Sequence, residues 1–135
     1  MPKILVVEDS FSMRSFVRSA LEAGTGDLGE VDIVEASGGF EALRLLPRGP
    51  YDLVITDINM PDINGLELIQ FIRTNEHHRA TPILLISTQS SERDRTRALS
   101  LGADGYVAKP FTPEDLRTRV KAQLEKGRTS ARGDG

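Results

Sequence analysis

Five short aliphatic runs recur along the chain, and each is followed by a longer segment with helical periodicity. The runs lie at 3–7, 31–36, 52–56, 82–87 and 105–109. Most lack polar alternation, which is typical of strands buried on both faces of a parallel sheet. The helical segments lie at 11–23, 39–46, 65–74, 92–103 and 113–126. This alternation predicts an α/β fold, a doubly wound parallel five-stranded sheet with helices on both faces.

The apolar stripe of each predicted helix indicates which side chains belong to the core. In the first helix, Phe11, Phe16 and Val17 fall on one broad face, and Phe40 and Leu43 do so in the second. Periodicity does not determine the order of the strands in the sheet. The strand order therefore remains open at this point.

Composition narrows the class of protein. The 135 residues are 39% hydrophobic and 27% charged, with no cysteine, so disulfides and thiolate metal sites are excluded. A net charge of −3 gives no basic field for direct nucleic-acid binding. The apolar run Ile4–Val7 is too short for a signal peptide or a membrane span, so we expect a cytoplasmic protein. We expect one domain at 1–126 and a disordered polar tail or linker start at 127–135.

Ligands of parallel α/β sheets bind beyond the carboxyl ends of the strands. Those positions carry Glu8, Asp9 and Asp57, followed by Ser87 and Lys109 on the last two strands. Two unit charges about 4 Å apart repel by roughly 4 kcal/mol at an effective dielectric constant of 20. Converging carboxylates would therefore hold protons or bind a cation. Mg²⁺ suits oxygen ligands at this rim, the solvent-exposed carboxyl edge of the sheet, because it keeps several water molecules. The alternative is three solvated loop acids without a shared role.

Lys109 and Ser87 add a second kind of chemistry to this rim. An ammonium group and a hydroxyl could hold the oxygens of an anion, as phosphoryl chemistry requires. The simpler alternative is a lysine paired with Asp57 and a serine that ends a strand, and a resting state can satisfy both. By contrast, "SGG" at 37–39 is interpreted as a turn, because no Lys-Ser/Thr P-loop ending follows it.

Four segments together resemble the receiver domain of two-component response regulators. They are "ILVVEDS" (4–10), "DLVITDINMPDINGLEL" (52–68), "PILLIS" (82–87) and "GADGYVAKPF" (102–111). The resemblance spans residues 2–126 and is closest to stand-alone, chemotaxis-type (CheY-like) receivers. It implies their flavodoxin-like strand order 2-1-3-4-5, which we adopt by resemblance.

The resemblance also implies a phosphoacceptor and a metal site. Asp57 matches the aspartate that attacks the phosphohistidine of a histidine kinase, and Mg²⁺ is the implied cofactor. Asp9 and Asp57 match direct metal ligands, and Glu8 matches an acid acting through a metal-bound water. The backbone carbonyl of Asn59 matches a further ligand.

Three more matches concern the phosphoryl group and the response to it. Ser87 and Lys109 match the groups that bind the phosphoryl oxygens, and Tyr106 matches an aromatic switch that turns inward. The alternative for Tyr106 is an ordinary half-buried tyrosine. Pro110 matches a proline preceded by a cis peptide. The implied output surface is the fourth helix, fifth strand and fifth helix, which would bind a downstream protein partner.

Some positions depart from the family pattern or tune it. Thr88 stands where small residues are common, which would narrow access to the phosphoryl group. Asn59 and Gln89 occupy the two positions that tune hydrolysis of the phosphoaspartate. His77 and His78 lie in a polar loop and are expected to be solvated, not metal ligands.

Two other function classes are alternatives to the switch. A haloacid-dehalogenase-like phosphohydrolase also uses a strand-end Asp with Mg²⁺, but its general acid is a second Asp where this chain has Asn59. A pseudo-receiver that only binds partners would not need the intact acids and Lys109. We therefore expect a phosphorylatable switch, not a turnover enzyme. Whether the chain is stand-alone or part of a longer protein, and whether its pathway is chemotaxis, stays open.

Overall fold

The computed structural model of the chain describes residues 1–22, 28–88 and 92–134. The strands are β1 Lys3–Val7, β2 Asp32–Ala36, β3 Leu53–Asp57, β4 Ile83–Thr88 and β5 Gly105–Lys109. The helices are α1 Phe11–Glu22, α2 Gly39–Leu45, α3 Gly65–Thr74, α4 Glu92–Leu101 and α5 Pro113–Asp134, with a 3₁₀ turn, η1, at Leu46–Arg48. The predicted strand–helix alternation is confirmed.

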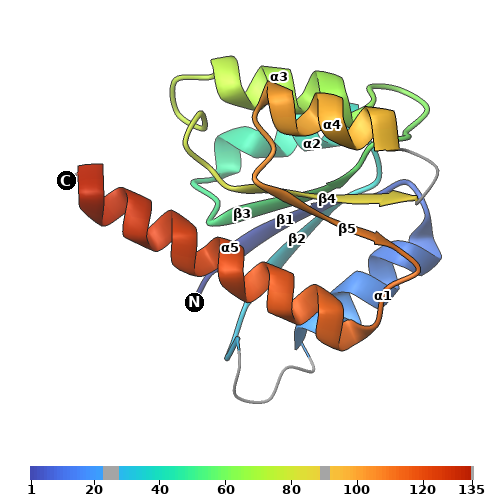
Figure 1. Cartoon of the computed structure of the whole chain (residues 1–135), viewed down its shortest axis with the longest axis horizontal. Helices are drawn as coiled ribbons and strands as arrows, with labels where there is room; N and C mark the ends of the chain where they lie inside the picture. Colours follow the sequence, from blue (N-terminus) through green and yellow to red (C-terminus); the bar gives the residue numbers. More distant parts are fainter. Residues whose placement is uncertain (23–27, 89–91, 135) are drawn as a thin grey trace.

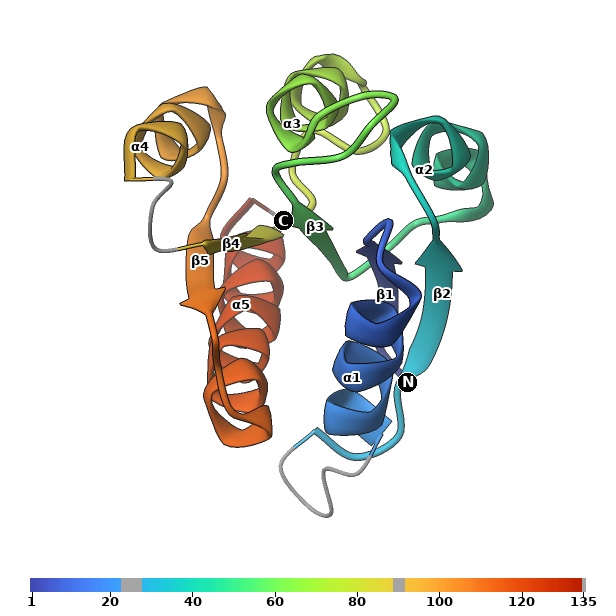
Figure 2. The ribbon, with the colours of Figure 1, turned by 90° about the vertical axis from the view of Figure 1, so that its right-hand side faces the viewer.

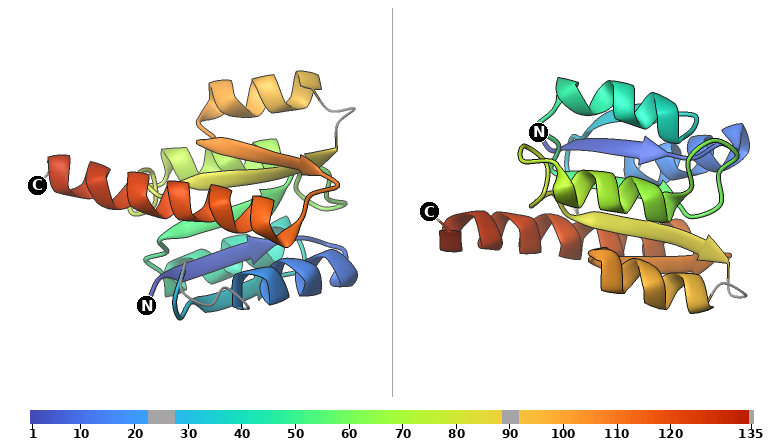
Figure 3. Two further views of the ribbon diagram at one scale, coloured as in Figure 1. Left: turned by 60° about the horizontal axis from the view of Figure 1, so that its bottom comes forward. Right: turned by 90° about the horizontal axis from the view of Figure 1, so that it is seen from above.

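All five strands are parallel and lie in the order β2-β1-β3-β4-β5, which is the flavodoxin-like order that the resemblance implied. In the register of the sheet, Val7 pairs with Thr56, Asp57 with Ile86, and Ser87 with Ala108. The carboxyl ends of β1, β3, β4 and β5 therefore meet at one edge of the sheet, as Figure 3 shows.

Helices cover both faces of the sheet: α2, α3 and α4 lie on one side, and α1 and α5 lie on the other (Figures 1 and 2). Alternate residues of each strand supply the two cores. In β1, Leu5 and Val7 belong to the core under α2–α4, whereas Ile4 and Val6 belong to the core under α1 and α5. Each fully buried aliphatic side chain contributes about 1.5–3 kcal/mol. The two cores thus hold the strands, and with them the carboxyl edge of the sheet, rigidly in place.

Several expectations about individual segments were wrong. The helix α5 extends to Asp134, past the predicted end of the domain at residue 126, and the expected disorder of 127–135 stays a prediction. Phe11 and Phe40 are 72% and 64% exposed, since each lies in the first turn of its helix, beyond the end of the sheet. His78 is buried, whereas His77 is exposed as expected. Among the described residues, no helix is long and apolar enough to cross a membrane.

Candidate functional site at the carboxyl edge of the sheet

Asp57 is the last residue of β3, a strand whose five residues are all buried. Its Oδ1 accepts a hydrogen bond from the backbone N–H of Ile58 at 2.7 Å and a longer one from Asn59 at 3.4 Å. The strand and the turn after it therefore fix the carboxylate. The side chain retains 9% exposure, so it is held firmly but still reaches the surface.

Lys109 approaches the same carboxylate from the end of β5. Its Nζ donates to Asp57 Oδ2 at 3.0 Å and lies 3.7 Å from Glu8 Oε2. The second distance is too long for a hydrogen bond. The ammonium group is thus hydrogen-bonded to Asp57 and attracts Glu8 through charge alone. The pairing with Asp57 is the one that the sequence analysis gave as the simpler role of Lys109.

The three acids converge as the sequence suggested. Glu8, Asp9 and Asp57 each offer a carboxylate oxygen, and these oxygens lie within 4.8 Å of one another. Burial, and then the neighbouring Asp57 carboxyl group, raise the pKa of Glu8 to about 7, against the opposing effects of the Ser10 N–H and Lys109. Below about pH 7 the Glu8 carboxyl group is therefore mostly protonated, unless a bound cation favours its ionised form.

The cluster fits a divalent cation that prefers oxygen ligands. Glu8 Oε2 is buried and has no hydrogen-bond partner among the described residues. Asp9 is exposed, so the cluster opens to water on one side. Carboxylates that share a site with room for water suit Mg²⁺, which keeps part of its hydration shell. Asn59 follows directly on the same rim, between the buried residues Ile58 and Met60.

Ser87 lies on β4, between the strands that carry Asp57 and Lys109. It is 1% exposed, and its Oγ lacks a hydrogen-bond partner among the described residues. A buried hydroxyl without a partner costs about 1–3 kcal/mol. Such a group is ready to bind an acceptor that arrives at the site. Thr88 ends the same strand opposite Lys109, and Gln89 lies outside the described residues.

Tyr106 lies in β5, partly buried against the core under α2–α4. The guanidinium carbon of Arg95 lies 4.8 Å from the centre of its ring, which links α4 to β5 by a cation–π contact. The peptide between Lys109 and Pro110 is cis, as the resemblance implied.

Arg14 is a residue near the site that the sequence reasoning missed. Its Nη1 donates to the backbone carbonyl of Glu8 at 2.8 Å, and its Nε pairs with Glu35 Oε1 at 3.2 Å. The guanidinium therefore ties the end of β1 to β2 and helps to orient the acid pair. A basic residue soon after two consecutive acids was the available signal, but only the fold shows the direction of the side chain.

Comparisons with known proteins agree with this geometry. Residues 4–121 match the family described as the response regulator receiver domain. A "Chemotaxis protein CheY homolog" of Campylobacter jejuni is 36% identical over 126 residues, covering 93% of this chain and 94% of that protein. "Chemotaxis protein CheY-3" of Vibrio cholerae is 36% identical over 124 residues, with 92% of each chain covered. The solved structure of CheY4 of Vibrio cholerae superposes with a TM-score of 0.82 at 32% identity, covering 91% of this chain and 98% of that one.

Proposed function

The chain belongs to the response regulator receiver domain family, and we propose that it is a phosphorylation switch in which Asp57 accepts a phosphoryl group from a histidine kinase. The observation that carries this proposal is the Asp57 carboxylate, held 3.0 Å from Lys109 within the acid cluster. CheY-like receivers are a signalling family and not a class of turnover enzymes. Their similarity to this chain supports phosphorylation on aspartate as its basic reaction.

In the proposed transfer, an Asp57 oxygen attacks the phosphorus of a phosphohistidine. A P–O bond forms, the P–N bond breaks, and the imidazole nitrogen keeps the electron pair and takes up a proton. Lys109 would move from its pairing with Asp57 to a phosphoryl oxygen. A bare carboxylate cluster would repel the incoming group, so a cation beside Asp57 is needed to offset the repulsion.

We assign Mg²⁺ to the acid cluster. Asp9 and Asp57 would bind it directly, Glu8 would act through a water molecule, and Asn59 would contribute its backbone carbonyl. When bound, the ion neutralises charge on the phosphoryl oxygens. The unpartnered Oε2 of Glu8 and its raised pKa support this assignment, because both indicate a buried acid without its full complement of positive charge.

The response to phosphorylation would begin at Ser87. A phosphoryl group offers strong acceptor oxygens, and the Ser87 hydroxyl has no partner among the described residues. Movement of Ser87 toward these oxygens would let Tyr106 turn inward. This differential interaction shifts the population toward an active state, which binds a downstream protein through α4, β5 and α5. Thr88 would narrow access to the phosphoryl group, and Asn59 with Gln89 would set its lifetime.

The proposed setting is the cytoplasm, where a histidine kinase would supply the phosphoryl group. The chemotaxis relatives make a chemotaxis pathway the first one to examine. Asn59 argues against the phosphohydrolase alternative, because the second Asp of that class would be its general acid.

The test is phosphotransfer from candidate kinases in the presence and absence of Mg²⁺, followed by intact-protein mass spectrometry. We expect one added phosphoryl group in the wild type with Mg²⁺ and none in Asp57→Asn. Repeated turnover of small phosphomonoesters would instead support the hydrolase. Normal signalling by Asp57→Asn in cells would support the pseudo-receiver.

A further inference from the structure

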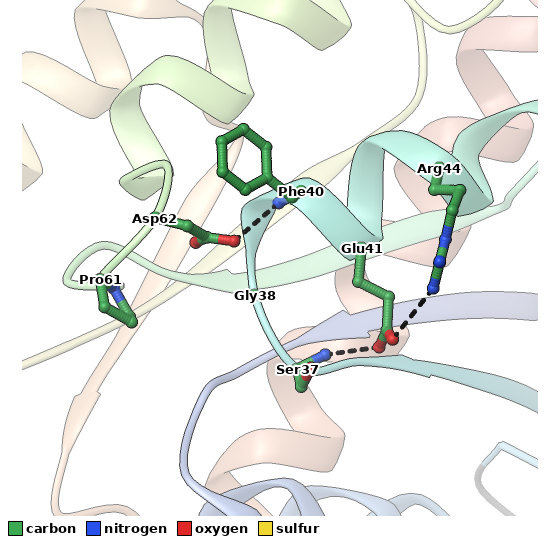
Figure 4. Close-up of a pocket in the computed structure, with 7 residues that line it drawn as sticks. All are labelled: Ser37, Gly38, Phe40, Glu41, Arg44, Pro61 and Asp62. Carbon is green, nitrogen blue, oxygen red and sulfur yellow. Dashed lines mark hydrogen bonds and ion pairs between the residues drawn. The ribbon is translucent and has the colours of Figure 1, made fainter.

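Asp62 ties the loop after β3 to the first turn of α2. Its Oδ1 accepts hydrogen bonds from the N–H groups of Gly39 at 3.0 Å and Ile63 at 2.7 Å. Its Oδ2 accepts one from the N–H of Phe40 at 2.9 Å, the contact drawn in Figure 4. These bonds, that from Phe40 first, lower the pKa of Asp62, so the carboxylate is charged at neutral pH. One side chain therefore joins segments more than twenty residues apart.

The two glycines at the start of α2 permit this close approach. A Cβ at Gly38 would lie 2.8 Å from Asp62 Oδ2, and a Cβ at Gly39 would lie 2.6 Å from the Cβ of Ile63. Real Cβ atoms essentially never come so close to another heavy atom. The glycines of the "SGG" sequence at 37–39, interpreted above as a simple turn, therefore allow the loop to pack closely against α2, and at Gly39 the contact includes the backbone of Ile63.

The same loop is closed at its base by Gly65. The N–H of Gly65 donates to the carbonyl of Ile58 at 2.7 Å, and a Cβ at this position would collide with the carbonyl oxygen of Asp57. The side chain of Asn64 then caps α3 by accepting from the N–H of Glu67 at 2.9 Å. Asn59 therefore lies between two fixed points of the loop: Ile58, which is bonded to Gly65, and Asp62, which is bonded to the start of α2.

We propose that Asp62 is a positioning residue for the Mg²⁺ site. By holding the loop on α2, Asp62 fixes the segment that carries Asn59. In the proposed site, the backbone carbonyl of Asn59 binds Mg²⁺ together with the carboxylates. Mg²⁺ demands near-ideal octahedral geometry, so a loosely held carbonyl weakens its binding. The inference rests on the proposed function, because it requires Mg²⁺ to bind at the acid cluster.

The test is Mg²⁺ titration of the unphosphorylated chain by calorimetry. We expect Asp62→Ala to weaken Mg²⁺ binding about tenfold, the lower end of the effect of losing an outer-shell partner. Asp62→Asn, which also lacks the charge but keeps one acceptor oxygen, should lose clearly less. Glu41→Ala is the matched control, because Glu41 and Asp62 both line the pocket drawn in Figure 4. It removes an acid of α2 that does not bind the loop: its Oε1 accepts from the Ser37 N–H at 2.8 Å.

A second readout separates positioning from charge. In NMR spectra, Mg²⁺ should shift the amide signals of Gly39 and Phe40 in the wild type but not in Asp62→Ala. Gly39→Ala should also weaken Mg²⁺ binding, although this variant keeps the Asp62 carboxylate and its charge, because the new Cβ would displace Ile63 and with it the loop.

The outcomes are distinguishable. Wild-type affinity in Asp62→Ala overturns this inference alone, and so does an equal loss in Glu41→Ala, which would indicate a general charge effect. Absence of Mg²⁺ binding in the wild type would overturn the Mg²⁺ assignment together with the inference. Urea unfolding without Mg²⁺ checks that each variant is folded, and Asp62→Asn replaces Asp62→Ala if the latter is not.

Discussion

The ammonium nitrogen of Lys109 lies 3.0 Å from Asp57 Oδ2, although the two residues come from strands separated by β4. In this arrangement the ammonium group neutralises part of the charge of a carboxylate that we propose as a Mg²⁺ ligand. If Mg²⁺ binds Asp57 as proposed, the Lys109 contact should compete with it.

Replacement of Lys109 by Met should separate the two roles of the lysine. We expect tighter Mg²⁺ binding, by about three- to tenfold, because a competing cation has gone. Phosphotransfer should nevertheless fall by about 100-fold, since the phosphoryl oxygens lose their ammonium partner. Calorimetry and single-turnover phosphotransfer check the two effects. Lys126→Met, far along α5, is the control, and weaker Mg²⁺ binding in Lys109→Met would contradict the competition.

The raised pKa of Glu8 predicts a specific dependence of stability on pH. Without Mg²⁺, the folded state binds the Glu8 proton up to about pH 7, whereas the unfolded state releases it near the ordinary value of 4.5. The free energy of unfolding should therefore fall as pH rises from about 4.5 to about 7, by at most on the order of 3 kcal/mol. Urea unfolding across this range checks it.

Glu8→Gln should flatten that profile, because the amide does not titrate. Saturating Mg²⁺ should have a similar effect near neutral pH, since the ion binds the ionised form. If the free energy of unfolding of Glu8→Gln falls with pH as steeply as that of the wild type, a group other than Glu8 causes the pH dependence.

Ser87 offers a prediction in which loss of a polar group is favourable. Ser87→Ala should raise the free energy of unfolding by about 1 kcal/mol or leave it unchanged, because it removes a buried hydroxyl without a described partner. The Ser87→Ala variant should also lose the change in partner affinity, or in the NMR spectrum, that phosphorylation causes in the wild type. Thr56→Val is the matched contrast: the Thr56 hydroxyl donates to the Asp57 carbonyl at 3.0 Å, so its loss should destabilise by about 1 kcal/mol.

The cation–π contact between Arg95 and Tyr106 should favour the resting position of the ring. An exposed contact of this kind contributes about 0.5–1 kcal/mol, so Arg95→Leu should raise the inward population by about two- to fivefold. Side-chain NMR of Tyr106 measures that population. Arg93→Leu, two residues earlier and on a different face of α4, should leave it unchanged. Equal effects of the two substitutions would point to α4 as a whole.

Tyr106→Ala tests the output surface itself. We expect partner affinity to lose its response to phosphorylation, because the ring that would turn inward is gone. Unchanged affinity and an unchanged response would place the output surface elsewhere. A binding assay with and without phosphorylation measures both quantities.

Local sequence signals were sufficient where the structure depends on neighbouring residues. The bounds of β1, β5 and α3 agree with the aliphatic runs and helical periodicity, because burial on both faces of a strand or on one face of a helix leaves a local pattern. Asp57 at the end of β3 was also predictable, since an acid after a buried strand must lie at the rim.

The sequence alone, read as strand–helix alternation, determined the fold class and the acids, lysine and serine at the carboxyl ends of strands. Tertiary structure decided the contacts of the site. Lys109 is hydrogen-bonded to Asp57 and lies near Glu8, Arg14 binds the carbonyl at the end of β1, and Asp62 accepts hydrogen bonds from the start of α2. The tertiary structure also left Phe11 and Phe40 exposed despite their apolar pattern. The physical reason is that hydrophobic periodicity is a property of neighbouring residues, whereas strand order, ion pairing and pKa shifts depend on residues brought together from distant parts of the chain.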